Sequence, residues 1–298
     1  MKRFQNILVY PVNIIRSDPA IATATDIAQR TGANITLVSI ETLQARTPAQ
    51  VLACHQWHRE CRASSADLLR ELRASGVSAD AVVLEGSDPA QLIIDTVRSR
   101  RMDLVIKTAR SSDIPRNRFY STVATELLQR GECPIWIVRA TEHARPSRIL
   151  AALGPLGSFY EQKRIDRDVV DVAAQLAETR QGELHLVSAW YAAVTSQRHI
   201  GMAEYQAYLQ DCEFDAWSTL RRFLVDYPVD IPWSNVHLRR GHGDEVIARV
   251  ADEIDADVVV VGSSGRTGLR RWILGNTVEQ VMRRTSRAMV GVRAVAPQ

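Results

Sequence analysis

Short apolar runs alternate along the chain with longer stretches in which apolar residues recur every three or four positions. In the first half, the short runs predict strands at 6–9, 34–39, 81–86, 103–106 and 134–139. Helical spacing lies between them at 19–31, about 48–75 and 89–100. Because the strands are continuously apolar and are separated by helices, the pattern predicts a parallel sheet covered by helices on both faces.

The second half of the chain repeats this order of elements. Its strands are expected at 148–151, 183–188, 235–241, 257–261 and 288–293. Its helices are expected at 167–180, about 202–227 and 244–255. The sequence distance between equivalent residues grows along the repeat, which indicates insertions in the loops of the second copy. The pattern therefore predicts two doubly wound α/β domains in tandem.

Length agrees with two domains, since 298 residues exceed the roughly 150 of a typical domain about twofold. A segment at 140–147 with no hydrophobic period has the character of a short linker. We therefore expect a first domain at 1–140 and a second at 147–298. So short a linker keeps the two domains together as neighbours in one molecule, and the pattern leaves open whether two chains form a homodimer.

Composition excludes several classes of protein. The net charge is +3, and no block of Lys and Arg is long enough for a nucleic-acid arm, so we expect no nucleic-acid partner. No apolar stretch approaches the roughly 20 residues that span a bilayer, so no membrane partner is expected. Four cysteines are too few for a disulfide framework. A cytoplasmic location is the resulting expectation.

A glycine-rich loop follows the strand at 257–261. Gly262 and Gly265 are separated by two residues, and nine further residues precede Gly275. The order of strand, glycine loop and helix lets backbone N–H groups and a helix N-terminus bind phosphate oxygens. The spacing is neither that of a Walker A loop nor that of the dinucleotide fingerprint G-x-G-x-x-G. A plain turn with nothing bound is the alternative explanation.

This spacing resembles the nucleotide-binding pattern of the universal stress protein family, in which the third glycine is followed by Ser or Thr. The two copies extend the resemblance over nearly the whole chain, and the second loop is most similar to the tandem, UspE-like branch. The resemblance implies two Rossmann-like domains of the adenine nucleotide alpha hydrolase-like type, each with a five-stranded parallel sheet flanked by helices. It also implies that the two domains pair as the subunits of single-domain members do.

The resemblance implies ATP or another phosphate-bearing small molecule as the ligand, with Mg²⁺ if ATP is bound. The residues expected to hold phosphate are Gly262, Ser263, Gly265, Arg266, Gly275, Asn276 and Thr277. Gly241 and His242 would flank a sugar, and the base would lie near Gly154 and Val187.

The chain departs from the family pattern at two positions, and these limit how far the family's nucleotide-binding role can be expected of it. The Asp that ends the first strand in ATP-binding members corresponds here to Val12 and Gly154. Asn276 stands where the pattern has Ser or Thr, although Thr277 is adjacent and Asn also donates to oxygen. In the first half, all motif glycines are replaced, while Lys107, Arg110, Arg116 and Arg118 add positive charge. We expect that half to serve as structure and partner surface.

One further cluster has metal-like spacing. Cys54, His58 and Cys61 would share one face of a helix, although no fourth ligand is evident, and buried core cysteines beside a histidine are the ordinary explanation. We find no catalytic constellation. The expected function is a stress-response or regulatory binding protein. A ligand-free interaction scaffold and a weak nucleotide hydrolase are the alternatives left open.

Overall fold

The computed structural model describes residues 4–41, 48–110, 123–139, 148–154, 160–192, 201–263 and 276–293. Side chains at 48–55, 57, 58, 160, 161, 276 and 277 are outside this description. The predicted linker at 140–147 also lies outside the described residues, so the domain boundaries remain a prediction. No helix within the described ranges is both long and apolar enough to cross a membrane.

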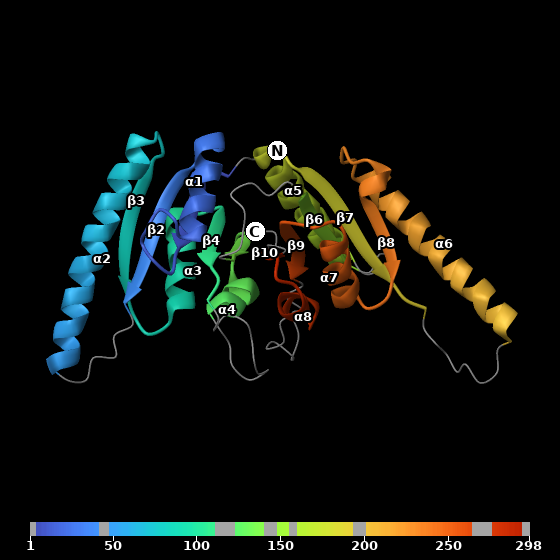
Figure 1. Ribbon diagram of the computed structural model, residues 1–298. Helices are drawn as coiled ribbons and strands as arrows, with labels where there is room; N and C mark the ends of the chain where they lie inside the picture. The colour runs from blue at the N-terminus through green and yellow to red at the C-terminus, as the bar shows by residue number, and fades with distance from the viewer. Residues whose placement is uncertain are drawn as a thin grey trace.

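Ten strands form one continuous sheet in the order β3-β2-β1-β4-β5-β10-β9-β6-β7-β8 (Figure 1). The first five strands are β1 (Asn6–Tyr10), β2 (Asn34–Glu41), β3 (Ala79–Glu85), β4 (Leu104–Thr108) and β5 (Ile135–Val138). The second five are β6 (Arg148–Leu153), β7 (Glu183–Trp190), β8 (Val236–Arg240), β9 (Val258–Ser263) and β10 (Ala288–Arg293). All strand pairs inside each half are parallel, which confirms the predicted fold class.

The two halves join through β5 and β10, which pair antiparallel with Trp136 opposite Val290. The halves therefore share one hydrogen-bonded sheet. Figure 1 shows them side by side, related by an approximate twofold, with α2 and α6 at the two outer ends.

Eight helices cover the sheet in the described part of the chain. In the first half they are α1 (Pro19–Thr31), α2 (Pro48–Ala74), α3 (Pro89–Arg100) and α4 (Val123–Arg130). The second half has α5 (Tyr160–Arg180), α6 (Met202–Asp226), α7 (Gly243–Glu253) and α8 (Asn276–Arg284). One core cluster lies between the sheet and α1, α2, α5 and α6, and the other lies under α3, α4, α7 and α8. Both clusters contain residues of both halves, so neither half has a core separate from the other.

Local sequence explains where these helices begin. Asp18 and Asp88 cap α1 and α3 by accepting from the backbone N–H groups of Ala20 and Gln91, and each is followed by a Pro at the first helical position. The helix predicted at 167–180 begins earlier, at Tyr160. Its first turns are mostly polar, so the spacing of apolar residues did not predict them as helical.

Candidate functional site

The predicted site of the second half lies at the carboxyl ends of β6 and β9. These strands are neighbours, with Ala152 opposite Val261, and they meet where the strand order changes direction. Ligands of open α/β sheets bind in the crevice outside such a point. Gly154 follows β6, and Gly262 and Ser263 end β9, so the structure brings these three predicted residues to one edge of the sheet.

Helix α5 packs directly against the two glycines at this edge. A Cβ on Gly262 would overlap the Cγ2 atom of Ile165, and a Cβ on Gly154 would overlap the side-chain amide of Gln162. Gly262 therefore allows the close approach of α5 to the sheet, whether or not a ligand binds, whereas at Gly154 the overlapping atoms belong to the flexible end of the Gln162 side chain.

A carboxylate that the sequence analysis missed lies at the end of β6. Asp166 of α5 is 2% exposed and accepts hydrogen bonds from Gly154 N (2.9 Å) and Gln162 Nε2 (2.8 Å). Burial raises the pKa of Asp166 above its ordinary value, while these two hydrogen bonds act in the opposite direction. Asp166 thus holds the backbone after β6, close to where the resemblance places a strand-ending Asp.

The first half contains the same arrangement after β1. Asp18 Oδ2 accepts from the backbone N–H groups of Val12 (3.0 Å) and Asn13 (3.1 Å), and the Thr108 hydroxyl donates to Asp18 Oδ1. Pairing registers make Thr108 the counterpart of Gly262, because each lies two residues beyond the strand residue opposite Val9 or Ala151. Asp18 could have been found from the sequence as the residue before a helix-starting Pro, whereas Asp166 lies inside a helix and gives no such signal.

The remaining predicted residues lie in several places. Gly241 follows the edge strand β8, two strands from β6; its φ of +145° and its N–H bond to Trp190 O (2.9 Å) make it a turn glycine. His242 is exposed and precedes α7. Val187 is buried in the core under α7, so its side chain does not line the edge of the sheet. Ser263 is also buried.

Much of the glycine loop cannot be compared with the structure. Gly265, Arg266 and Gly275 lie outside the described residues. Asn276 and Thr277 begin α8, with side chains outside the description. What the structure does establish is the frame of the loop, since β9 ends at Ser263 and a helix begins at Asn276.

The first half contains a cavity of about 250 Å³ at the equivalent edge of its sheet. Residues after β1, residues near the end of β2 and one face of α2 line it, among them Asn13, Ser39, Glu60 and Arg110. Arg110 lies 5.6 Å from the centroid of the Tyr10 ring. Positive charge therefore borders this cavity although the motif glycines are absent from this half.

Lys107 adds a second cation beside Tyr10. Its side chain is 1% exposed, its Nζ donates to Thr108 O (3.0 Å), and it lies 5.7 Å from the Tyr10 ring centroid. Two of the first-half cations singled out from the sequence, Lys107 and Arg110, thus contact the same aromatic ring at the end of β1. Arg116 and Arg118 lie outside the described residues.

No metal site is found within the described residues. Cys61 is partly buried and forms no disulfide, while the side chains of Cys54 and His58 lie outside the description. The predicted metal-like cluster is therefore untested as a whole.

Comparison with known proteins identifies the family. The profile of the universal stress protein family matches residues 4–139 and 163–293. Universal stress protein E of Salmonella typhi is 26% identical over 297 residues, covering 95% of this chain and 92% of that protein. A universal stress protein E homolog of Haemophilus influenzae is 28% identical over 212 residues, covering 71% and 68%.

Solved structures agree in fold. A protein of unknown function from Pseudomonas aeruginosa PAO1 superposes with a TM-score of 0.73 at 24% identity, covering 97% of this chain and 92% of the other. A universal stress protein from Archaeoglobus fulgidus gives a TM-score of 0.63 at 16% identity, covering 96% and 98%. With two family matches that together span most of its length, the chain belongs to the universal stress protein family.

Proposed function

We propose that this chain is a regulatory stress-response protein whose second half binds ATP or another phosphate-bearing small molecule. The observation that carries the proposal is the frame of the glycine loop: β9 ends at Ser263 beside β6, and α8 begins at Asn276. Backbone N–H groups of a glycine-rich loop and of a helix N-terminus are the groups that proteins use to bind phosphate.

The residues proposed to hold phosphate are the loop residues Gly265, Arg266 and Gly275 and the helix start at Asn276 and Thr277. A Mg²⁺ ion would arrive with the nucleotide and be held mainly by its phosphates. Asp166, the buried carboxylate at this edge, accepts from Gly154 N and Gln162 Nε2 through Oδ1 and holds the backbone after β6. Gly154 stands where the resemblance places a strand-ending Asp, so we propose binding and not hydrolysis as the activity.

The packing of α5 decides which variant tests this proposal. A larger residue at Gly262 would collide with Ile165 and perturb the fold, so its loss of binding would not be informative. Arg266→Gln removes one charged donor from the loop and keeps Gly262, the residue that packs against Ile165 of α5. A hydrogen bond to a charged group contributes about 1.5–3 kcal/mol, so ATP should bind at least about tenfold more weakly to this variant.

The measurement is ATP titration by calorimetry and native mass spectrometry, with and without Mg²⁺. We expect one nucleotide per chain for the wild type, weaker binding for Arg266→Gln, and unchanged binding for Arg110→Gln, the matched change at the first-half cavity. Weakened binding in Arg110→Gln alone would place the ligand in the first half. No binding by the wild type would favour the scaffold alternative, and phosphate release above the buffer rate would favour a hydrolase.

A further inference from the structure

Helix α6 leaves an unusual amount of apolar surface exposed. Only Leu220 and Phe223 of its 25 residues are buried. Of the large hydrophobic side chains that are exposed in the described ranges, most lie on α6 or just after it: Met202, Tyr208, Phe214, Val225 and Trp233. Phe214 is 71% exposed and Trp233 is 59% exposed. A gathering of this kind on one element marks an interaction surface more often than scattered single residues do.

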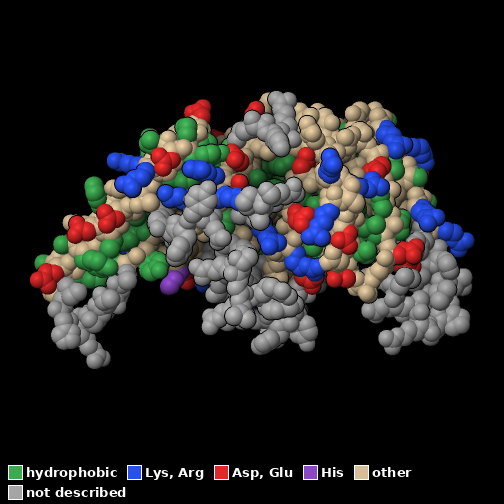
Figure 2. Space-filling model, turned by 180° about the vertical axis from the view of Figure 1, so that it is seen from behind, with side chains coloured by type: hydrophobic (Ala, Val, Ile, Leu, Met, Phe, Trp, Pro, Cys, Tyr) green, Lys and Arg blue, Asp and Glu red, His purple; other side chains and the backbone are tan. Residues whose placement is uncertain are grey.

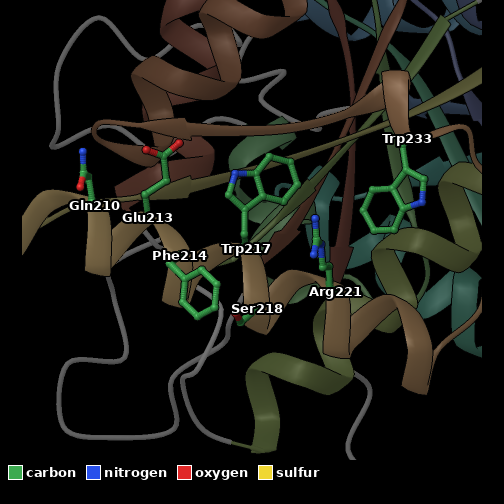
Figure 3. Close-up of a pocket in the computed structure, with 7 residues that line it drawn as sticks. All are labelled: Gln210, Glu213, Phe214, Trp217, Ser218, Arg221 and Trp233. Atoms are coloured by element: carbon green, nitrogen blue, oxygen red, sulfur yellow. The ribbon is translucent and has the colours of Figure 1, made fainter.

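Two of these side chains, Phe214 and Trp233, border a groove of about 540 Å³. Phe214, Trp217 and Arg221 recur at helical spacing on one face of α6, and Trp233 forms the opposite wall (Figure 3). The Arg221 guanidinium lies between the two indole rings in this view, 5.9 Å from the centroid of Trp233. A whole aromatic side chain has about 150–250 Å² of surface, and Phe214 and Trp233 expose 71% and 59% of theirs. These two side chains therefore supply part of the roughly 800 Å² that a stable interface buries per partner, and the rest of the exposed face of α6 must supply the remainder.

An acidic and a basic side chain lie on opposite sides of Trp217 along the groove. Glu213 lies four residues before Trp217, and Arg221 lies four residues after it. Neither side chain forms an ion pair with any residue that the structure describes. Figure 2 shows this helix at the left end of that view, with acidic side chains towards its lower end and basic side chains beside acidic ones higher up.

This order makes the helix complementary to itself. In an antiparallel pair of α6 helices centred on Trp217, Glu213 lies at the level of Arg221 of the partner subunit. An interface with a twofold axis requires such self-complementarity, since the same patch serves both subunits. At about 1.5 Å per residue, α6 is roughly 37 Å long, enough to carry the whole contact.

We propose that the exposed face of α6, together with Trp233, is the surface through which two copies of this chain pair as a twofold dimer. This surface lies at the outer end of the sheet, away from the β5–β10 seam that joins the two halves (Figure 1). The assignment is independent of the nucleotide site.

The test is the molar mass of the full chain by sedimentation velocity and light scattering, from low micromolar concentration upwards. We expect a dimer for the wild type. Phe214→Gln should raise the dissociation constant at least about tenfold, since buried aromatic anchors dominate interfaces. Ile15→Gln, which replaces a side chain that is 52% exposed in the first half, is the matched control and should leave it unchanged. Circular dichroism and the melting temperature check that the variants fold.

Reciprocal charge exchange tests the antiparallel arrangement. Glu213→Arg and Arg221→Glu should each weaken the dimer, because each places like charges together, and the double exchange should restore it. A wild type that stays monomeric over the whole concentration range would overturn the proposal. So would a dimer that Phe214→Gln leaves intact, or a double exchange that associates no better than the single variants.

Discussion

A buried ion pair ties the two halves together on the face covered by α1 and α5. Arg180 of α5 has a side chain that is 2% exposed, and its Nε lies 3.1 Å from Asp26 Oδ2 of α1. Its guanidinium lies 5.4 Å from the ring centroid of Trp136 in β5. Asp26 also pairs with Arg30, 2.9 Å away on the same helix. We predict that Asp26→Ala weakens the whole molecule and not only the first half.

The size of the effect follows from the burial of the two partners. Breaking a buried ion pair costs about 3–5 kcal/mol when one charge stays buried. Asp26 is 22% exposed, so solvent screens part of the interaction and we expect a loss of about 2–3 kcal/mol. Arg180→Met removes the buried charge and keeps an apolar stem, so its cost should be about 1 kcal/mol. The double variant should then cost less than the sum of the two, with a coupling of at least about 1 kcal/mol.

The assay is urea unfolding followed by circular dichroism and by tryptophan fluorescence, since Trp136 lies beside Arg180. Arg30→Met is the control, because Arg30 also pairs with Asp26 but is more exposed, and it should cost under about 0.5 kcal/mol. If Asp26→Ala costs no more than Arg30→Met, or if the double variant shows no coupling, the ion pair does not join the halves energetically.

Three further predictions concern other parts of the molecule. His185 and His237 are buried with Nδ1 and Nε2 3.2 Å apart, and burial lowers the pKa of both below the ordinary histidine value. As pH falls below about 6.5, the folded state therefore binds fewer protons than the unfolded state, and the free energy of unfolding should drop on acidification. In urea titrations from pH 8 to 5, His237→Phe should make the free energy of unfolding depend less on pH. Burial raises the pKa of the Cys133 thiol to about 12, so Ellman's reagent should label it at pH 8 only after unfolding; equal labelling of the native protein would contradict this. Gly291→Val would drive a Cβ into Leu128 of α4 across the seam and cost about 1–3 kcal/mol by urea unfolding, and a shortened Leu128→Ala partner should recover part of it.

Much of the fold could be predicted because strands and helices of this class bury continuous or periodic apolar faces. The order of elements and the parallel sheets follow from those patterns. The early start of α5 could not be predicted, since its first turns are mostly polar and, of the side chains described there, only Ile165 and Asp166 are buried. The hydrophobic pattern also could not predict that β5 pairs antiparallel with β10. Both strands are buried on both faces, and a continuously apolar strand does not indicate which other strand it pairs with.

The candidate site could be predicted only in outline. Glycine spacing indicated Gly262, and the family resemblance indicated Gly154; the two lie at one edge of the sheet. Gly262 is also needed for the packing of Ile165 of α5, whether or not a ligand binds. The sequence analysis did not predict Asp166 because its hydrogen bond from Gly154 N joins the interior of a helix to the end of a strand, and hydrophobic periodicity does not indicate such a contact. The burial of Val187 also follows from which sheet face its side chain occupies, and that depends on the register of β7.

The two halves hold the backbone after their first strands with different contacts, and this difference bears on which half can bind phosphate. Each uses a buried Asp to hold the backbone after its first strand. In the first half, the Thr108 hydroxyl completes that contact, whereas Gly262 leaves room for Ile165 of α5. Restoring a glycine at Thr108 would remove a hydrogen-bond donor from Asp18 without supplying the later loop glycines, so it should destabilise the first half and confer no phosphate binding.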